Sequence, residues 1–247
     1  MGRTTDPPAS LIEPPVVEHR HRDIQGGVAR ASVFGASDGL VSNVSLILGV
    51  AGASPTGDFV RLAGIAGLIA GAVSMAAGEY VSMRAQAELF ERELELERTE
   101  IRRNPHVETV ELTQIYQARG IDPDTARTMA SEVMSDPDRA LEAHAREELG
   151  IDPQSLGSPL RAAASSFVAF AVGAALPLIP WLVTDGWPAI IASVVLGILG
   201  AAFLGFALGT FTGRSRLFSA ARQVLIAVVA AGVTFGVGSL LGVATTG

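Results

Sequence analysis

The chain has 247 residues, of which 49% are hydrophobic and 17% are charged, and its mean hydropathy is +0.39. Because soluble domains usually carry about 25% charged residues, this composition argues against an ordinary soluble enzyme. The sequence contains no cysteine, which excludes disulfides and thiolate metal sites, and a pI near 5.1 argues against a nucleic-acid partner.

The first 30 residues are polar and contain several prolines as well as the cluster His19–Arg22. They lack the apolar core that a secretory signal places before a small-residue cleavage site. We therefore predict a disordered cytosolic tail over residues 1–30. The side chains of the cluster suit metal ions or lipid headgroups, and the alternative interpretation is an ordinary solvated tail segment.

Five apolar stretches follow the tail, at residues 31–53, 59–83, 160–183, 187–212 and 217–244. Each reaches the length of about 20 residues that an α-helix needs to cross the hydrocarbon core. Small residues repeat along the second and fourth stretches, which favours close packing of membrane helices. The sequence therefore predicts an all-α protein built on a five-helix transmembrane bundle, with spans 1 and 2 in residues 31–83 and spans 3 to 5 in residues 159–247.

The segment between the second and third stretches has a different character. Residues 84–161 carry the whole formal net charge of −7, because Arg and acidic residues are equally frequent in the rest of the chain. Strong helix formers extend the second stretch to residue 103, where Asn104-Pro105 ends the helix. Two Asp-Pro pairs have the pattern of a helix N-cap followed by the first helical residue. Residues 84–158 are therefore predicted to form a small helical domain, with further helices at 106–119, 123–134 and 137–149.

The placement of Arg residues predicts the orientation in the membrane. Arg residues flank the tail, both ends of the insert and the loop after the fourth stretch, whereas the opposite side holds only Arg61. Positively charged residues accumulate on the cytosolic side of membrane proteins. We therefore expect a cytosolic N-terminus, a cytosolic helical domain at 84–158 and a C-terminus outside.

The acidic insert contains a pattern of potential metal ligands. Glu97 and Glu100 share one helix face, and Glu108 and Glu111 repeat that spacing on the next helix. Close carboxylates repel one another unless a cation neutralises them, which suits hard or borderline divalent ions. His144 and Glu148 lie one turn apart on the last helix, and imidazole shifts the preference towards Fe²⁺ or Zn²⁺. The alternative interpretation is a solvated acidic surface whose charges pair with Arg98, Arg102 and Arg103.

Two acidic residues lie inside the first two membrane stretches. Asp38 and Glu79 are exceptional because ionisable groups within membrane spans are costly and mark ion pathways or proton relays. Met75 lies at a depth similar to that of Asp38, so a carboxylate and a thioether are expected at one level, a combination that favours a transition-metal ion. The alternatives are that Asp38 caps a helix break at Gly39, and that Met75 faces lipid or the core.

Two of these stretches resemble the vacuolar iron transporters. The similar segments are SDGLVSNVSLILGVAGA at 37–53 and AGAVSMAAGEYVSM at 70–83, together with REELG at 146–150. The resemblance implies a homodimeric five-span transporter that exports Fe²⁺, and often Mn²⁺, from the cytosol in exchange for protons. It implies no prosthetic group, and it places the ion path between the two first spans. The residues that it assigns to the path are Asp38, Met75, Glu79 and Asn43.

The resemblance also assigns ligands to the cytosolic domain, namely Glu97, Glu100, Glu108, Glu111 and Glu148. One position departs from the family pattern, since His144 stands where the family often has Met. Imidazole is a competent ligand whose protonation makes ion capture more sensitive to pH. The departure bears on metal preference, and Zn²⁺ is a further possible ion at this domain.

Two other functions fit parts of the sequence. Paired glutamates on helices also build di-metal carboxylate oxidases, but those sites use a Glu-x-x-His spacing and Leu141 precedes His144 by three residues. A membrane-anchored metal sensor would use the insert alone, although such an anchor has no need for Asp38 or Glu79. The membrane is expected to be the plasma membrane of a bacterium or the vacuolar membrane of a eukaryote.

Overall fold

A computed structural model describes residues 27–54, 57–150, 152 and 157–246. These residues form helices and contain no strand, which confirms the all-α fold class. Most of the predicted tail, including the cluster His19–Arg22, lies outside the described residues. The helices are α1 (Gly27–Ala53), α2 (Gly57–Arg103), α3 (Pro105–Ala118), α4 (Pro123–Met134), α5 (Pro137–Glu147), α6 (Pro159–Leu178), the short 3₁₀-helix η1 (Ile179–Leu182), α7 (Gly186–Thr212) and α8 (Arg216–Thr246).

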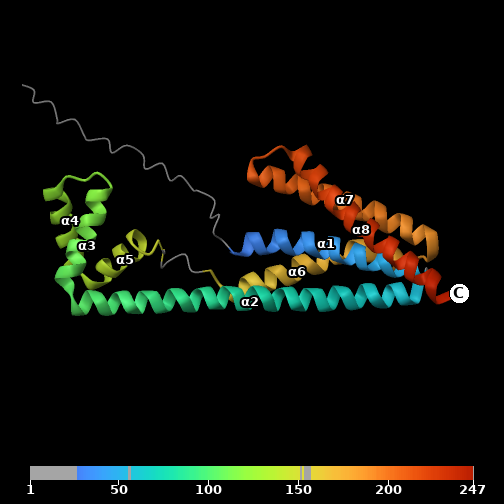
Figure 1. The fold of residues 1–247 in the computed structure, drawn as a ribbon, viewed down its shortest axis with the longest axis horizontal. Helices are drawn as coiled ribbons and strands as arrows, with labels where there is room; N and C mark the ends of the chain where they lie inside the picture. Colours follow the sequence, from blue (N-terminus) through green and yellow to red (C-terminus); the bar gives the residue numbers. More distant parts are fainter. Residues whose placement is uncertain (1–26, 55–56, 151, 153–156, 247) are drawn as a thin grey trace, which may run out of the picture.

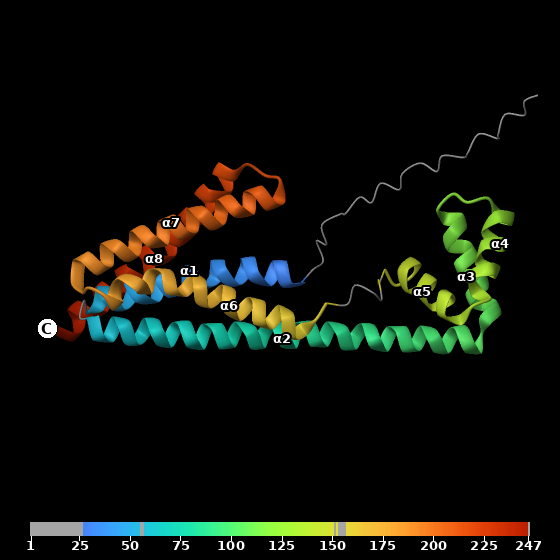
Figure 2. The same ribbon diagram turned by 180° about the vertical axis from the view of Figure 1, so that it is seen from behind.

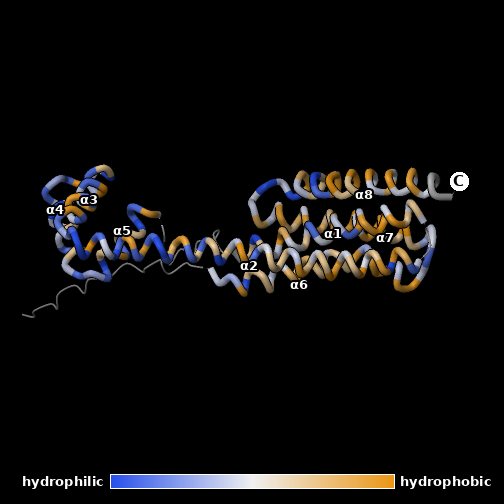
Figure 3. Tube along the Cα trace, turned by 60° about the horizontal axis from the view of Figure 1, so that its bottom comes forward, coloured by the Kyte–Doolittle hydropathy of each residue, from blue (hydrophilic) through white to orange (hydrophobic). Residues whose placement is uncertain are grey.

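Five helices are long and apolar enough to cross a membrane, as predicted: α1, α2, α6 with η1, α7 and α8. They run alternately up and down, so the start of α1 and the insert lie towards one end of the bundle, and the C-terminus lies at the other (Figures 1 and 2). Orange and white predominate in the bundle, with a few blue segments, whereas blue is more frequent in the insert (Figure 3). The chain is therefore an integral membrane protein with a separate polar domain.

Helix α1 lies at the centre of the bundle and packs against α6, α8, α2 and α7. Glycines make its crossing with α6 close: a side chain at Gly39 would overlap the backbone carbonyl of Phe170, and one at Gly173 would overlap that of Ala36. Small residues let membrane helices approach to backbone contact in this way. α1 continues without a break through Gly39, so the alternative that Asp38 caps a helix break there is wrong.

The third apolar stretch changes geometry near its end because proline removes a backbone donor. Pro177 lies inside α6, and the chain then tightens into η1, which contains Pro180. The carbonyl of Pro177 accepts a hydrogen bond of 2.7 Å from Ser193 of α7. Arg61 of α2 donates to the carbonyl of Trp181 in η1, and it pairs at 2.7 Å with Asp185, which directly precedes α7. These contacts join α2, η1 and α7 at the end of the bundle opposite the insert.

Helix α2 has 47 residues and passes from the bundle into the insert without interruption. At about 1.5 Å per residue it is roughly 70 Å long. The break at Asn104-Pro105 turns the chain into α3, and the insert then folds back so that α5 packs on α2. Figure 1 shows α3, α4 and α5 gathered at the far end of α2.

Local capping chemistry fixes the short helices close to their predicted bounds. Asp122 accepts from the backbone N–H of Thr125 at the start of α4, and Asp136 accepts from the N–H groups of Asp138 and Arg139 at the start of α5. Pro follows each cap at the first helical position, where its missing N–H costs nothing. A small apolar core holds α3 and α4 together, formed by Leu112, Tyr116, Ala126 and Ala130.

Candidate metal centre and membrane path

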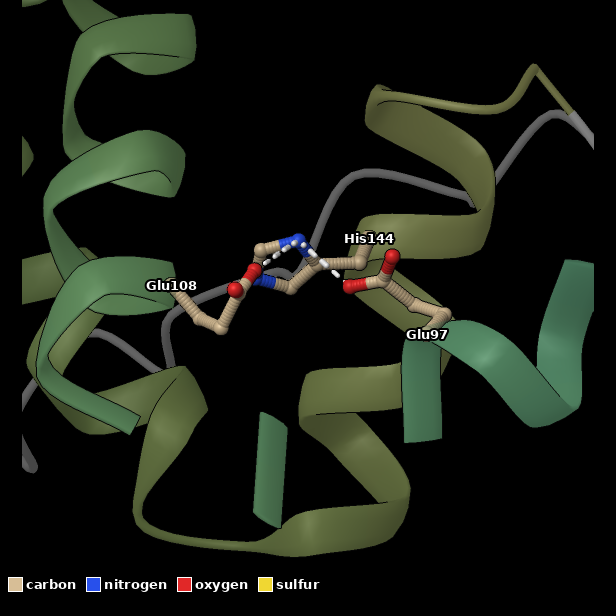
Figure 4. Close-up of side chains that lie close together, drawn as sticks. All are labelled: Glu97, Glu108 and His144. Atoms are coloured by element: carbon tan, nitrogen blue, oxygen red, sulfur yellow. Dashed lines mark ion pairs between the residues drawn. The ribbon is translucent and has the colours of Figure 1, made fainter. Parts of the chain in front are cut away.

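Three helices of the insert bring a cluster of ligand-type side chains together. Glu97 lies near the end of α2, Glu108 lies in the first turn of α3, and His144 lies on α5. Figure 4 shows the two carboxylates on either side of the imidazole ring. One ligand atom of each residue lies within 4.8 Å of the others, so a single ion between them would be within reach of all three.

The nitrogen Nδ1 of His144 is the point on which the carboxylates converge. It lies 3.1 Å from Oε1 of Glu97, 3.8 Å from Oε2 of Glu108 and 3.2 Å from Oε2 of Glu148. Glu148 comes from the end of the same helix as His144, one turn later. A proton or a metal ion at Nδ1 would therefore face three carboxylates at once.

The centre is buried, which is unusual for carboxylates. Glu97, Glu108 and His144 are 3%, 6% and 0% exposed. Burial raises the pKa of Glu97 to about 7, and the charge of Glu148 adds to this shift while His144 opposes it. Burial also raises the pKa of Glu108, as do the neighbouring charges of Glu111 and Glu100. Negative charge on these buried carboxylates is therefore costly, and a bound cation would reduce that cost.

Two buried atoms of the centre have no hydrogen-bond partner among the described residues. They are Oε1 of Glu97, which lies close to His144 without hydrogen-bond geometry, and Nε2 of His144. Buried polar atoms in proteins are nearly always paired, and exceptions often mark an ion or ligand that is not present. The donor set of carboxylate oxygens and one imidazole nitrogen fits a borderline divalent ion.

The other predicted ligands lie around this cluster. Glu100 is exposed and Glu111 is half-buried, so they contribute charge near the centre but do not belong to the convergent set. The Arg residues considered as partners do not neutralise the centre either, since Arg98 pairs with Glu95 at 2.7 Å, while Arg102 and Arg103 are exposed. The interpretation as a solvated acidic surface therefore fails for Glu97 and Glu108, which are buried.

In the membrane bundle, Asp38 lies on α1 and is half-buried. Its Oδ1 accepts a hydrogen bond of 2.8 Å from the hydroxyl of Ser42. Ser42 lies one turn further along α1, and its side chain is exposed. Ser42 was not among the predicted site residues, although the spacing of four residues is the signal that could have identified it. Asp38 and Ser42 thus form a polar strip one turn long on α1.

Met75 and Asn43 lie against α6 rather than in the open. Met75 packs on a cluster formed by Ala72, Phe170 and Ala174. Within a single copy of the chain, this contact agrees with the alternative that Met75 faces the core. Asn43 is buried, and its Nδ2 donates 2.6 Å to the carbonyl of Ala174. Its Oδ1 has no hydrogen-bond partner among the described residues.

Glu79 lies on α2 nearer the insert and is paired with Arg30. The distance between Arg30 Nη2 and Glu79 Oε1 is 2.8 Å, and the side chain of Glu79 is only 12% exposed. The two residues are 49 positions apart, so no local spacing in the sequence indicates this pair. The pair links α1 to α2 near the end of the bundle that faces the insert.

The sequence is similar to a set of membrane transporters. A family model described as the VIT family matches residues 29–239, which include the bundle and the insert. The vacuolar iron transporter of Acanthamoeba castellanii is 38% identical over 93% of this chain and 85% of its own length. Vacuolar iron transporter 1 of Eucalyptus grandis is 32% identical over 85% of each chain, and the protein of that name from Arabidopsis thaliana is 31% identical over 85% of this chain and 84% of its own.

Proposed function

The chain belongs to the VIT family, and from this premise we propose that it moves Fe²⁺ or Mn²⁺ out of the cytosol in exchange for protons. Its relatives are named as transporters, so the chain is a metal transporter and not an enzyme. The observation that carries the finer proposal is the buried convergence of Glu97, Glu108 and His144 on one point. It supplies an ion-capture site outside the membrane bundle.

Capture begins in the field of the insert. Its net negative charge raises the local concentration of cations near the centre. A divalent ion between Glu97, Glu108 and Glu148 would relieve their mutual repulsion and replace the hydration that burial removes. Glu100 and Glu111 increase this field from the periphery. Fe²⁺ and Mn²⁺ are the proposed cargo, and Zn²⁺ is a further ion that the donor set accommodates.

Helix α2 connects the capture centre to the membrane acids. Glu97 and Glu79 lie on this one helix, 18 residues apart, which corresponds to about 27 Å. An ion released from the centre would meet Glu79 at the entrance of the bundle. There the ion would have to displace Arg30, which pairs with the Glu79 carboxylate. Asp38 and Met75 lie deeper and offer an oxygen and a sulfur ligand to a transition-metal ion.

A second copy of the chain would complete the path. Asp38 and Ser42 lie on a part of α1 that the described chain leaves partly open. A carboxylate facing hydrocarbon is costly, so such groups face a partner or a water-filled cavity. We therefore propose a homodimer in which the two α1 helices lie next to each other, with Asp38 of each copy lining the path. Asn43 is buried against α6 and would join the path by releasing its hydrogen bond to the carbonyl of Ala174.

Proton exchange follows from the chemistry of these carboxylates. When a divalent ion leaves Asp38 and Glu79, protons from the far side can neutralise the carboxylates that remain. The protonated groups would return to the cytosolic side and release their protons before the next ion binds. The proposed orientation has the N-terminus and residues 84–158 in the cytosol, as the distribution of Arg predicts. The proposed location is the vacuolar membrane in a eukaryote or the plasma membrane in a bacterium.

Transport across liposomes tests the proposal. The full-length protein is reconstituted, a proton gradient is imposed, and uptake of Mn²⁺ and Fe²⁺ is followed with a metal-sensitive dye alongside a pH dye. We expect Asp38→Asn to abolish both metal flux and the coupled proton flux. Asp138→Asn is the matched control, because it removes an exposed carboxylate of the insert remote from the bundle.

Three results would contradict parts of the proposal. Metal flux that is unchanged in Asp38→Asn would exclude Asp38 from the path. Metal flux without proton counterflow would exclude proton exchange. Binding of metal by the intact protein without any flux would instead support the membrane-anchored sensor, and oxygen consumption on addition of Fe²⁺ would support a di-metal oxidase.

A further inference from the structure

The capture centre contains a single nitrogen donor among its oxygen donors. We propose that His144 determines which ions the centre prefers, so that Zn²⁺ and other late first-row ions bind more tightly than Mn²⁺, and Mg²⁺ binds weakly. The inference rests on the proposed capture site and adds the ranking of its ions. It assigns to His144 the role of specificity-determining residue, whereas the carboxylates supply charge.

The geometry gives an ion little freedom to avoid the imidazole. Nδ1 of His144 is the atom that the three nearest carboxylates share, at distances between 3.1 and 3.8 Å. An ion that binds Glu97 and Glu108 together must therefore lie close to Nδ1. The His144 side chain is fully buried, and α5 holds it from a helix whose start is fixed by the Asp136 cap. The ring is thus preorganised as a ligand.

The chemistry of the donors then sets the ranking. Carboxylate oxygens alone suit Mg²⁺, Ca²⁺ and Mn²⁺, whereas imidazole suits Zn²⁺, Fe²⁺, Ni²⁺ and Cu²⁺. For a given mixed site the affinity rises from Mn²⁺ through Fe²⁺ and Co²⁺ to Cu²⁺, with Zn²⁺ below Cu²⁺. Oxygen donors alone follow the same order, but imidazole steepens it, because imidazole favours the late ions over Mn²⁺ and Mg²⁺. Peripheral charges such as Glu100 and Glu111 attract every divalent cation, whereas His144 is the only nitrogen ligand in the described cluster.

The ring itself, rather than a group behind it, is the source of the proposed selectivity. Nδ1 lies among the carboxylates at hydrogen-bond distance from Oε2 of Glu148, 3.2 Å, whereas Nε2 is buried and has no partner among the described residues. A metal-binding imidazole usually donates its other N–H to a carboxylate or carbonyl, so a metal ion on either nitrogen uses this same side chain. Replacement of His144 should therefore reduce the preference, and no other described side chain should substitute for it.

Ion binding to the full-length protein in detergent tests the proposal. Isothermal titration gives Kd values for Zn²⁺, Mn²⁺ and Mg²⁺ with the natural chain, with His144→Asn and with His144→Leu. Asn replaces the ring by an oxygen donor, and Leu fills a similar volume without a donor atom, which provides a second variant if one of the two folds poorly. His106→Asn is the matched control, because His106 is exposed on α3.

We expect both substitutions at His144 to raise the Kd for Zn²⁺ by about tenfold or more, as loss of a metal-site interaction does. The Kd for Mn²⁺ should change much less. The ratio of the two Kd values is the decisive quantity. In NMR spectra of protein labelled with ¹⁵N-histidine, Zn²⁺ should shift the resonance of the ring nitrogen of His144 that binds it, and the resonances of His106 should not respond. A purely structural role for His144 would not produce this shift.

The outcomes separate the inference from the proposed function. Equal losses of Zn²⁺ and Mn²⁺ affinity, or unshifted resonances of both ring nitrogens of His144 with Zn²⁺ bound, would overturn the role of His144 and leave the capture site intact. Failure of the natural chain to bind any of the ions would instead overturn the capture site. A Kd ratio that falls in the His144 variants and is unchanged in His106→Asn supports the inference.

Discussion

Glu97 is the residue at which the energetic cost of burying a carboxylate in the insert can be measured. The substitution Glu97→Gln keeps the size of the side chain and removes its charge. The pKa of Glu97 is raised by burial from 4.5 to about 7 in the folded protein. The folded state therefore binds this proton more tightly than the unfolded state does, and stability falls as the pH rises.

The size of the effect follows from the shift. Between pH 4.5 and 7 the carboxylate loses its proton in the unfolded insert before it does so in the folded one. At about 1.4 kcal/mol per pKa unit, the ion-free insert loses about 3 kcal/mol across this range, and the loss is complete above pH 7. Gln cannot ionise, so the insert of Glu97→Gln should keep this stability at pH 8. Both proteins should be similar at pH 4.5.

Hydrogen exchange of the backbone amides of α3 and α5 measures this local stability. In the presence of a chelator at pH 8, we expect protection of these helices to be about 100-fold higher in Glu97→Gln than in the natural chain. Mn²⁺ should restore protection in the natural chain and have little effect in Glu97→Gln. Glu95→Gln is the control, since Glu95 lies two residues away on α2 and pairs with Arg98 at the surface.

Two results would refute the reasoning. Protection of the natural chain that is independent of pH, after correction for intrinsic exchange, would show that the buried carboxylate is not destabilising. A Glu97→Gln protein that is less protected than the natural chain at pH 8 would show that the charge of Glu97 stabilises the ion-free insert through its neighbours.

Two further predictions concern the membrane bundle. Ser42→Cys should form a disulfide-linked dimer under mild oxidation if the α1 helices of two copies lie next to each other, and the product is unambiguous because the natural chain has no cysteine. Leu199→Cys is the control, since Leu199 is exposed on α7 and should not cross-link. Equal cross-linking of both variants would argue against the proposed interface. Gly39→Ala should destabilise the bundle by about 1–3 kcal/mol, as overpacking does, because the new methyl group overlaps the carbonyl of Phe170. Gly78→Ala is the control, since its methyl group meets open space and should leave the midpoint of thermal unfolding in detergent unchanged. Equal shifts of that midpoint in both variants would refute the packing argument.

The elements of the fold that were predictable depend on local chemistry. Hydropathy identifies the five long apolar helices because the length of a span is set by the bilayer. The Asp-Pro pairs locate α4 and α5 within two residues, since capping and the fixed dihedral angle of proline act within one turn. The first helix begins four residues before the predicted start at residue 31, since Gly27 to Arg30, which the sequence pattern assigns to the tail, form its first turn.

The parts of the site that the sequence could not predict depend on contacts between distant segments. Spacing places Glu97 and Glu100 on one face of a helix, but only the packing of α5 decides that Glu97 is buried and Glu100 is exposed. The pair formed by Arg30 and Glu79 joins two helices whose relative rotation no local pattern specifies. The role of His144 as the point of convergence likewise results from three helices meeting.

The uninterrupted course of α2 also fixes an angular relation. At 3.6 residues per turn, the 18 residues from Glu79 to Glu97 make about five complete turns, so both carboxylates leave the helix axis in the same direction. One inserted or deleted residue between them would turn the capture centre by about 100° around the axis relative to the membrane acids. Helical periodicity therefore keeps Glu79 and Glu97 in phase, and an insertion or deletion between them preserves this phase only if it spans close to a whole number of turns.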